Sequence, residues 1–212
     1  MIEIKKFTFN AFEENTYVLF DESKHCLIID PGCYSSDEEN ELIKFIENED
    51  LNPDFVLSTH CHIDHVLGNF KVKNHFDIPL KIPELEIPVY ESVKSYSDLY
   101  GFAGYQEADV DEYIPSDGKL SFGKSELEIA FTPGHSPGHI VLISNHQKFV
   151  IGGDVLFQSS IGRTDLPGGD HQQLLDSIRN KLFILEDDYI VHPGHGSETN
   201  IGFEKKFNPF LN

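Results

Sequence analysis

Thr59-His60-Cys61-His62-Ile63-Asp64-His65 places three imidazoles and a carboxylate close together, directly after the apolar run Phe55-Val56-Leu57. Side chains two positions apart on an extended chain point to the same side, so His60 and His62 can bind one ion. Asp64 and His65 are rotated away where a helical turn begins, and can reach a second ion. A structural zinc more often recruits cysteine and four protein ligands. This mixture of imidazole and carboxylate therefore predicts a catalytic metal site with an open position.

Three later loops repeat the arrangement. Each follows an apolar strand, and each presents a metal-binding side chain in a turn that Pro or Gly makes tight. Four strand ends of this kind imply one site assembled along one edge of a sheet. The three loops are Thr132-Pro133-Gly134-His135, Gly152-Gly153-Asp154 and His192-Pro193-Gly194-His195.

The order of these motifs, HxHxDH followed by GH, GGD and PGHG, resembles the metallo-β-lactamase-fold hydrolases. The resemblance runs from Ile28-Ile29-Asp30-Pro31-Gly32 to the C-terminus. It implies two divalent metal ions, with zinc expected and iron or manganese as alternatives, because imidazole and carboxylate accept all three. It also implies the ligands: His60, His62 and His135 for one ion, Asp64, His65 and His195 for the other, and Asp154 as the bridge.

A pair of metal ions implies a hydrolytic mechanism. Such sites lower the pKa of a bound water from about 15.7 to about 7, so a metal-bridging hydroxide is the expected nucleophile. The same ions polarise the scissile carbonyl and stabilise the developing oxyanion, so a nucleophilic Ser or Cys is not required. Asp64 and Asp154 are the expected catalytic residues, and Asp64 can also orient the hydroxide.

Other polar residues near the motifs have competing roles. Asp30 either holds a ligand histidine through its second ring nitrogen, as the resemblance implies, or simply forms the turn before Pro-Gly. The Cys61 side chain should point away from its two neighbours and not bind metal. His139 should support the site or the fold. The remaining histidines should lie on the surface or in packing contacts: His25, His75, His146, His171 and His192.

Within the family, the chain looks most similar to the small glyoxalase II-like hydrolases. The runs that carry this likeness are Gly153–Phe157, Ile161–Gly169 and Pro193–Thr199. Glyoxalase II enzymes hydrolyse S-2-hydroxyacylglutathione thioesters, so the implied activity is hydrolysis of S-hydroxyacyl thiol esters. Longer members carry a C-terminal helical domain that contacts glutathione. This chain ends at Asn212 without one, so the thiol carrier stays open.

Three alternative functions remain. A persulfide dioxygenase of related sequence would use one iron at the His60, His62 and His135 site. A lactonase would attack a carbonyl in the same way in a more apolar cleft, whereas antibiotic-hydrolysing β-lactamases are generally exported and are disfavoured. A metal-binding protein without catalysis would be expected to lack a ligand, and none is missing.

Composition agrees with a soluble intracellular enzyme. The chain has 212 residues and a formal net charge of −20, which disfavours nucleic acid as a partner. A small anionic substrate remains compatible, because the metal ions, Arg163 and the C-terminal lysines are local positive charges. Three cysteines, an odd number, fit a reducing compartment. The N-terminus lacks the apolar core of a signal peptide, and membrane-spanning runs are not seen, so a cytoplasmic location is expected. Oligomeric state is not readable.

Apolar periodicity predicts mixed α and β structure in a single domain, 1–212. The resemblance narrows this α/β (α+β) class to a four-layer αββα sandwich. An insertion at about 85–111 should form a flap, in which Tyr96, Tyr100, Phe102 and Tyr105 either line a substrate wall or pack the insertion. Helices are expected after an N-cap at Ser36 with Glu39 three residues on, and at 64–75, 171–185 and 199–207. Strands are expected at 2–9, 16–21, 25–30, 54–58, 78–82, 126–131, 139–144, 148–152 and 189–192.

Overall fold

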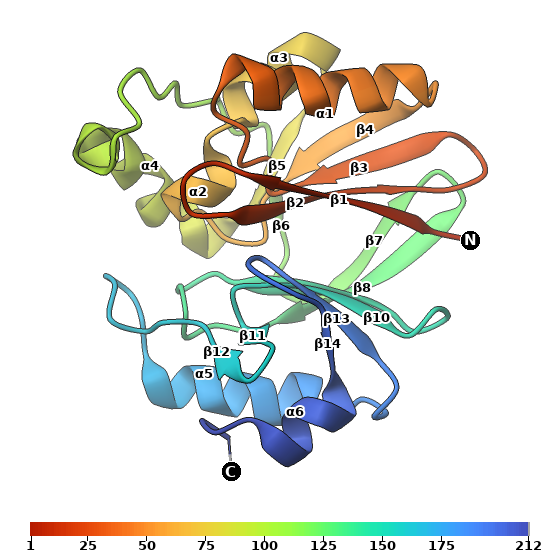
Figure 1. Ribbon diagram of the computed structural model, residues 1–212, viewed down its shortest axis with the longest axis vertical. Helices are drawn as coiled ribbons and strands as arrows, with labels where there is room; N and C mark the ends of the chain where they lie inside the picture. Colours follow the sequence, from red (N-terminus) through yellow and green to blue (C-terminus); the bar gives the residue numbers. More distant parts are fainter. Residues whose placement is uncertain (212) are drawn as a thin grey trace. The chain divides into compact units, whose positions relative to one another are not determined.

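The computed structural model describes residues 1–211. Its contacts divide the chain into two compact units. Unit 1 comprises Met1–Ile114 with Ser121–Ser125, and unit 2 comprises Pro115–Leu120 with Glu126–Asn212. Each is built around one six-stranded sheet (Figure 1). The expectation of a single domain stays a prediction.

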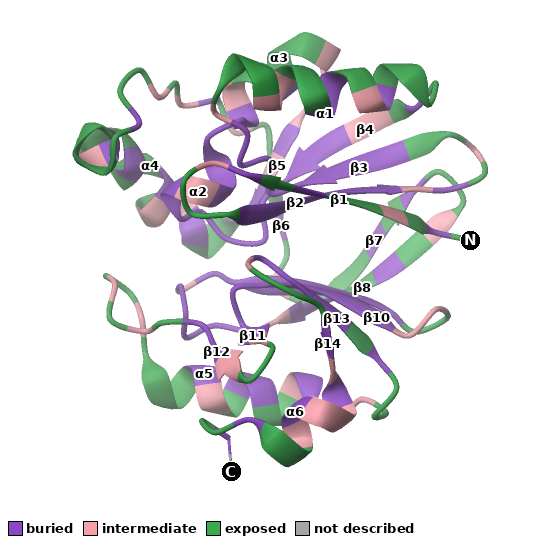
Figure 2. Ribbon diagram, viewed as in Figure 1, coloured by how far each residue is buried: buried purple, intermediate pink, exposed green. Residues whose placement is uncertain are grey.

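Unit 1 contains a mixed sheet with the strand order β1-β2-β3-β4-β5-β6. The first two pairings are antiparallel and the following three are parallel. β3 and the apolar end of β4 are buried, as Figure 2 shows in purple, because helices cover this part of the sheet. The strands are β1 (Glu3–Phe9), β2 (Glu14–Phe20), β3 (His25–Ile29), β4 (Asn52–Leu57), β5 (Leu80–Pro83) and β6 (Glu112–Ile114).

Helix α1 (Ser36–Asn48) covers this sheet beside α3 (Asn69–Phe76) (Figure 1). Its apolar face, at helical spacing, packs Leu42 and Ile46 into the core. The expected capping box exists, but one residue earlier than predicted: Ser35 is the N-cap and Glu38 its partner. The prediction of Ser36 with Glu39 was therefore wrong, because both pairs satisfy the same spacing.

The helix predicted at 64–75 is two helices, α2 (Ile63–Val66) and α3. The break falls at Gly68, whose N–H donates to the carbonyl of Pro31 at 2.7 Å. A Cβ at Gly68 would collide with the Cys33 sulfur, so the chain passes tightly against the turn that follows β3. This long-range contact has no signal in the local sequence.

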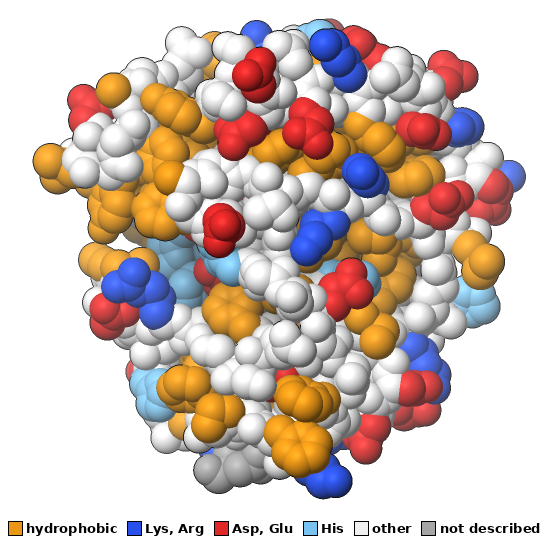
Figure 3. Space-filling model, viewed as in Figure 1, with side chains coloured by type: hydrophobic (Ala, Val, Ile, Leu, Met, Phe, Trp, Pro, Cys, Tyr) orange, Lys and Arg blue, Asp and Glu red, His pale blue; other side chains and the backbone are white. Residues whose placement is uncertain are grey.

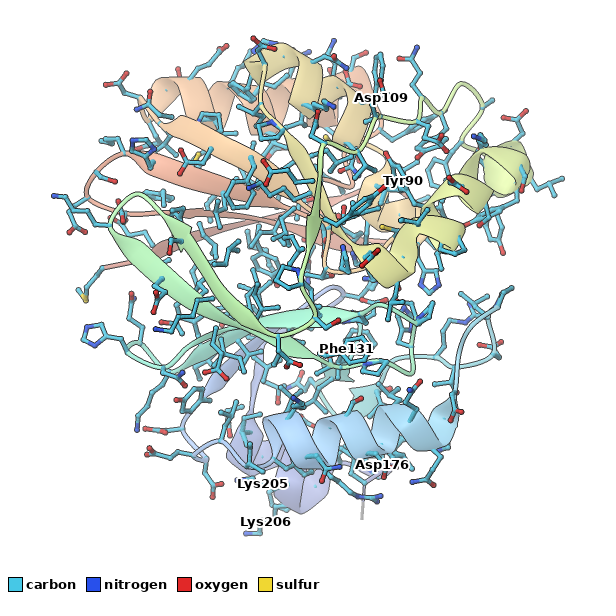
Figure 4. All side chains as sticks on the ribbon, turned by 180° about the vertical axis from the view of Figure 1, so that it is seen from behind. Tyr90, Asp109, Phe131, Asp176, Lys205 and Lys206 are labelled. Carbon is cyan, nitrogen blue, oxygen red and sulfur yellow. The ribbon has the colours of Figure 1, made fainter. Side chains whose placement is uncertain are left out.

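The predicted insertion is helical. It consists of the 3₁₀ turn η1 (Glu84–Glu86), α4 (Ile87–Tyr96) and the 3₁₀ turn η2 (Ser97–Tyr100). Tyr90 on α4 holds the loop that leads from η2 to β6. Its hydroxyl donates to the Ala108 carbonyl at 2.9 Å and accepts from the Ala108 N–H at 3.1 Å. Figure 4 labels Tyr90 on α4 and, in the returning loop, Asp109.

Unit 2 contains a second sheet, with the strand order β14-β13-β10-β9-β8-β7. β10 and β13 lie side by side and pair in parallel. The pairings of β10 with β9, of β9 with β8 and of β13 with β14 are antiparallel. Two short strands, β11 (Leu156–Phe157) and β12 (Ser160–Ile161), form a separate hairpin. The sheet strands are β7 (Gly118–Phe122), β8 (Ser125–Phe131), β9 (Ile140–Ser144), β10 (Phe149–Gly153), β13 (Ile190–Pro193) and β14 (Thr199–Asn200).

Two helical segments cover this sheet. Helix α5 (His171–Ser177) continues as the π-helical segment η3 (Ile178–Leu182), and Leu174, Ile178 and Leu182 pack against the strands. Helix α6 (Ile201–Phe207) begins later than the predicted 199–207, because Thr199–Asn200 pairs with β13 as β14. The Asn200 side chain then caps α6 by accepting from the Phe203 N–H at 2.8 Å.

Each unit thus supplies one helix-covered sheet, and the mixed α/β class is confirmed. The sequence reading missed short strands, β6, β7, β11, β12 and β14, because pieces of two to five residues show little periodicity. Within residues 1–211, none of the helices has the length and apolar character needed to cross a membrane.

Candidate metal centre

In unit 1, four of the predicted ligands lie on one loop and the helix that follows it. His60 and His62 come after the end of β4, His62 is the N-cap of α2, and Asp64 and His65 lie within α2. The His60 ring centre lies 4.9 Å from that of His62 and 4.1 Å from that of His65. The structure therefore brings the three imidazoles together, with His60 and His65 fully buried.

Asp30 supports this loop from the end of β3. One of its carboxylate oxygens accepts from the Thr59 N–H and the other from the Thr59 hydroxyl, both at 2.6 Å. Its Oδ2 also lies 3.3 Å from His65 Nδ1. Asp30 additionally adopts a left-handed turn conformation, with φ of 49°. Both expected roles are therefore combined, and the contact directs His65 Nε2 away from Asp30, as metal-binding histidines require.

Glu14, which the sequence reading missed, lies beneath the same histidine. Its side chain is fully buried, with Oε1 3.7 Å from His65 Nδ1 and Oε2 2.9 Å from the Thr16 hydroxyl. Burial raises its pKa well above the usual range, which favours the neutral acid. A Cβ at Gly32 would collide with Glu14 Oε2, so the Pro-Gly turn leaves room for this carboxyl. The signal in the sequence was a glutamate that opens a strand with no other charged residue.

Glu86 is a second buried carboxylate that the sequence reading missed. It lies at the end of η1 and accepts from the Cys61 N–H at 2.8 Å. Burial and the charge of Glu86 raise the pKa of the Cys61 thiol, which keeps it protonated and unsuited to metal binding. Nothing in the local pattern distinguishes Glu86 from the neighbouring Glu84.

In unit 2, the remaining predicted ligands come from three separate strand ends. His135 follows β8, Asp154 follows β10, and His195 follows β13. Asp154 Oδ2 lies 3.5 Å from His135 Nε2 and 3.5 Å from His195 Nε2. The parallel pairing of β10 with β13 brings two of these loops together, and the Gly194 N–H donates to the Gly153 carbonyl at 2.8 Å.

Backbone groups orient His135. Its Nδ1 donates to the Arg163 carbonyl at 2.8 Å, which leaves Nε2 facing Asp154. Gly134 has φ of 127°, and a Cβ there would collide with the Leu174 backbone on α5. Only glycine permits this turn to pack so closely on the helix.

His139 holds the loop of Asp154. Its Nε2 accepts from the Asp154 N–H at 3.0 Å, and its Nδ1 lies 3.4 Å from the Thr132 hydroxyl. The lone pair of this nitrogen is engaged by the backbone hydrogen bond and does not point at a metal ion. This agrees with the expectation that His139 supports the site or the fold.

Three of the other histidines and Arg163 are engaged elsewhere, and His146 and His171 are exposed. His192 is buried against Phe149 and lies 3.1 Å from Glu198, while His25 pairs with Asp54 at 2.6 Å. His75 lies 3.1 Å from Glu47. The Arg163 guanidinium forms a bidentate pair with Asp165, and it is the Arg163 carbonyl that contacts His135.

The donor atoms within each unit fit metal binding. Two ligand atoms about 2.1 Å from one tetrahedral ion lie about 3.4 Å from each other. The two Asp154 distances of 3.5 Å match this geometry, and His65 Nε2 lies 3.7 Å from Asp64 Oδ2. These separations are long for hydrogen bonds between imidazole and carboxylate. Neutral imidazole and carboxylate also form the donor set expected of a catalytic ion.

Known proteins resemble the chain over nearly its full length. The model of the metallo-beta-lactamase superfamily matches residues 10–195. Hydroxyacylglutathione hydrolase GloC of Haemophilus influenzae is 41% identical over 204 residues, which are 95% of this chain and 94% of GloC.

Two solved structures are similar in both fold and sequence. The BLEG-1 B3 metallo-beta-lactamase has a TM-score of 0.88 at 36% identity, covering 99% of this chain and all of that one. The di-iron-bound form of TTHA1623 has a TM-score of 0.87 at 33% identity, covering 98% and 100% of the two chains. The family match spans both units and includes all the predicted ligand positions, from His60 to His195. The chain is a metallo-hydrolase that belongs to the metallo-beta-lactamase superfamily.

Proposed function

We propose that this metallo-hydrolase is a glyoxalase II-like thioesterase that cleaves S-hydroxyacyl thiol esters with the help of two divalent metal ions. The similarity to GloC, a hydroxyacylglutathione hydrolase, supports the substrate class. The observation that carries the binuclear reading is the position of Asp154 Oδ2, 3.5 Å from the Nε2 atoms of both His135 and His195. One oxygen placed equally between two imidazoles is suited to bridging two ions.

The proposed ligand set is the one that the sequence predicts. We infer zinc as the metal, with iron as the alternative that the di-iron form of TTHA1623 suggests, and manganese as a third possibility. When bound, such ions polarise a carbonyl and supply a hydroxide at neutral pH. His60, His62 and His135 would hold one ion, Asp64, His65 and His195 the other, and Asp154 both.

The protein's own groups orient the ligands. Asp30 holds His65 through Nδ1, and the Arg163 carbonyl holds His135 in the same way. His139 fixes the backbone of Asp154. Asp64, which is partly exposed, is the carboxylate we assign to accepting a hydrogen bond from the attacking nucleophile. Asp64 and Asp154 are thus the proposed catalytic residues.

The test combines metal analysis with a substrate panel. Freshly purified protein should contain two ions per chain and should hydrolyse at least one 2-hydroxyacyl thioester among several thiol carriers. Failure on every thioester by metal-replete protein would refute the proposal. One iron per chain with oxygen uptake on a persulfide would identify a dioxygenase instead. Turnover restricted to lactones would identify a lactonase, and bound metal without any turnover would leave a metal-binding protein.

The proposed substrate is a small molecule, and its thioester bond is the bond that the proposed site hydrolyses. The cytoplasmic location expected from the sequence stays a prediction.

A further inference from the structure

Unit 1 carries an aromatic cluster, formed by Phe12, Tyr34, Tyr96, Tyr100 and Phe102. Phe12 packs on Tyr100 and Phe102 with ring centres 6.1 and 5.8 Å apart, and Tyr96 packs on Tyr100 at 5.6 Å. Phe102 is buried, whereas Phe12 and Tyr100 are 42% and 52% exposed. Figure 3 shows hydrophobic side chains gathered on the surface around α4. Large apolar groups grouped on a surface in this way mark a contact site.

The aromatic cluster is fastened to the loop that carries the proposed ligands. The Asn10 side chain accepts from the Phe12 N–H at 2.9 Å and donates to the carbonyls of Asp64 and Gly32, each at 3.0 Å. A second hydrogen bond ties the aromatic cluster to the insertion, because the Tyr34 hydroxyl donates to the Ala103 carbonyl at 2.6 Å. These bonds fix the turn of Phe12 and the insertion relative to Asp64.

Asn10 gives the geometric link between the aromatic cluster and the proposed site, because one side chain bonds both the Phe12 N–H and the Asp64 carbonyl. From Phe12 the aromatic cluster extends outward to the exposed Tyr100 ring.

The segment that supplies most of the aromatic cluster is strongly acidic. Its one lysine, Lys94, is paired with Glu107 at 3.1 Å. Glu86 is buried and Asp111 pairs with Lys73, but the exposed Asp98 stands between Tyr96 and Tyr100 in the chain. An anionic group placed on this wall would therefore meet like charge, and the segment offers no cation besides Lys94. The acidic residues are Glu84, Glu86, Glu91, Asp98, Glu107, Asp109 and Asp111.

We propose that the aromatic cluster binds the thiol arm of the thioester, and that this arm is apolar and uncharged rather than anionic. The inference rests on the proposed thioesterase activity. In a 2-hydroxyacyl thioester the acyl arm is small and polar, so the thiol arm is the part that an apolar wall can recognise. Glutathione carries two carboxylates and one ammonium group, so the acidic segment disfavours it here.

The experiment compares lactoyl thioesters of two thiols, benzyl mercaptan and glutathione, with metal-loaded protein. The wild type should have the higher kcat/KM for the benzyl thioester. Tyr100→Ala should lower that value by about tenfold, mainly through KM, while the glutathione thioester changes less than about twofold. Tyr100→Phe, which keeps the ring, should behave as the wild type.

Tyr113→Ala is the matched control, because Tyr113 is 55% exposed in unit 1 and lies outside the aromatic cluster. Metal content and thermal unfolding should be the same in all variants. A wild-type preference for the glutathione thioester would overturn the inference. Equal losses in Tyr100→Ala and Tyr113→Ala would overturn it as well.

A binding measurement separates this inference from the proposed function. The S-benzyl thioether that corresponds to the lactoyl thioester cannot be hydrolysed, and its affinity is measured by calorimetry. If neither thioester is cleaved, the thioesterase proposal fails. Thioether binding that weakens about tenfold in Tyr100→Ala would still support the apolar subsite, whereas equal binding to both proteins would refute it.

Discussion

The two units present their candidate metal-ligand residues in different ways. Unit 1 places His60, His62, Asp64 and His65 on one short segment after a single strand, and supports them with buried side chains. Unit 2 collects its candidate ligands from loops after β8, β10 and β13, and His135 is held by a backbone carbonyl. The positions of the contiguous candidates in unit 1 depend on supporting side chains, which mutation can remove. The positions of the dispersed candidates in unit 2 depend more on how the strands pair.

The largest effect is expected at Asp154 of unit 2, which lies 3.5 Å from two histidines. Asp154→Ala should remove the proposed bridge and lower kcat by about a thousandfold or more, while the fold persists. Activity on the best thioester and metal per chain are the measurements. Asp188→Ala, an exposed aspartate that pairs with Lys148, is the control. Native activity with full metal content in Asp154→Ala would refute the assignment.

Two histidines of unit 2 should differ in the size of their effect. His135→Ala removes a proposed ligand, so one ion should be lost on dialysis. His139→Ala only releases the Asp154 N–H, and should weaken metal binding by about 10- to 100-fold. Metal titrations of the two proteins provide the comparison. A greater loss in His139→Ala would reverse the assigned roles.

A third pair of variants tests side-chain support against backbone support. Asp30→Asn replaces an acceptor with an amide that cannot satisfy Thr59 and His65 together, so metal affinity should fall by about 10- to 100-fold. Arg163→Ala keeps the carbonyl that contacts His135, so its metal affinity should stay close to that of the wild type. Equal losses in the two variants would contradict the contrast between the units.

The smallest effect concerns the stability of unit 1 rather than catalysis. Burial alone would raise the pKa of Asp21, but hydrogen bonds from Ser23, Ser125 and the Lys124 N–H outweigh it and lower the pKa well below its usual value. Asp21→Asn should therefore cost about 1 to 3 kcal/mol in urea unfolding at pH 7.

The sign of the pH dependence follows from the lowered pKa of Asp21. Its contribution is fully present above the unfolded pKa of about 3.9 and is lost as the pH falls towards the folded pKa. The difference between wild type and Asp21→Asn should shrink below about pH 4. A constant difference between pH 7 and pH 3 would contradict this account.

The ligand candidates could be read from the sequence because they lie close after strands, four on one segment and three in separate turns. Pro and Gly mark such turns locally, and side-chain alternation along a strand tells which residues share a face. The supporting residues were harder to read. Glu14 reaches His65 from a distant strand, and Glu86 contacts Cys61 from the insertion. Neither contact is visible in local spacing.

The errors in element boundaries have the same origin. Ser35 and Ser36 are both suitable N-caps, but Glu38, the partner of Ser35, also accepts a hydrogen bond from the distant Asn10 N–H. The helix predicted at 64–75 is broken by the contact of Gly68 with Pro31, which depends on the turn after β3. Thr199 joins a strand because β13 offers it a partner. In each case a long-range contact outweighed local propensity.

The sequence by itself determined the ligand types, their positions at strand ends and the mixed α/β class, because turns and periodicity are local properties of the chain. Only the tertiary structure decided that Asp154 Oδ2 faces two histidines, that Asp30 and Glu14 converge on His65, and that Phe12 meets Tyr100. These contacts join residues far apart in the chain. Their formation depends on strand pairing and burial rather than on the spacing of residues along the sequence.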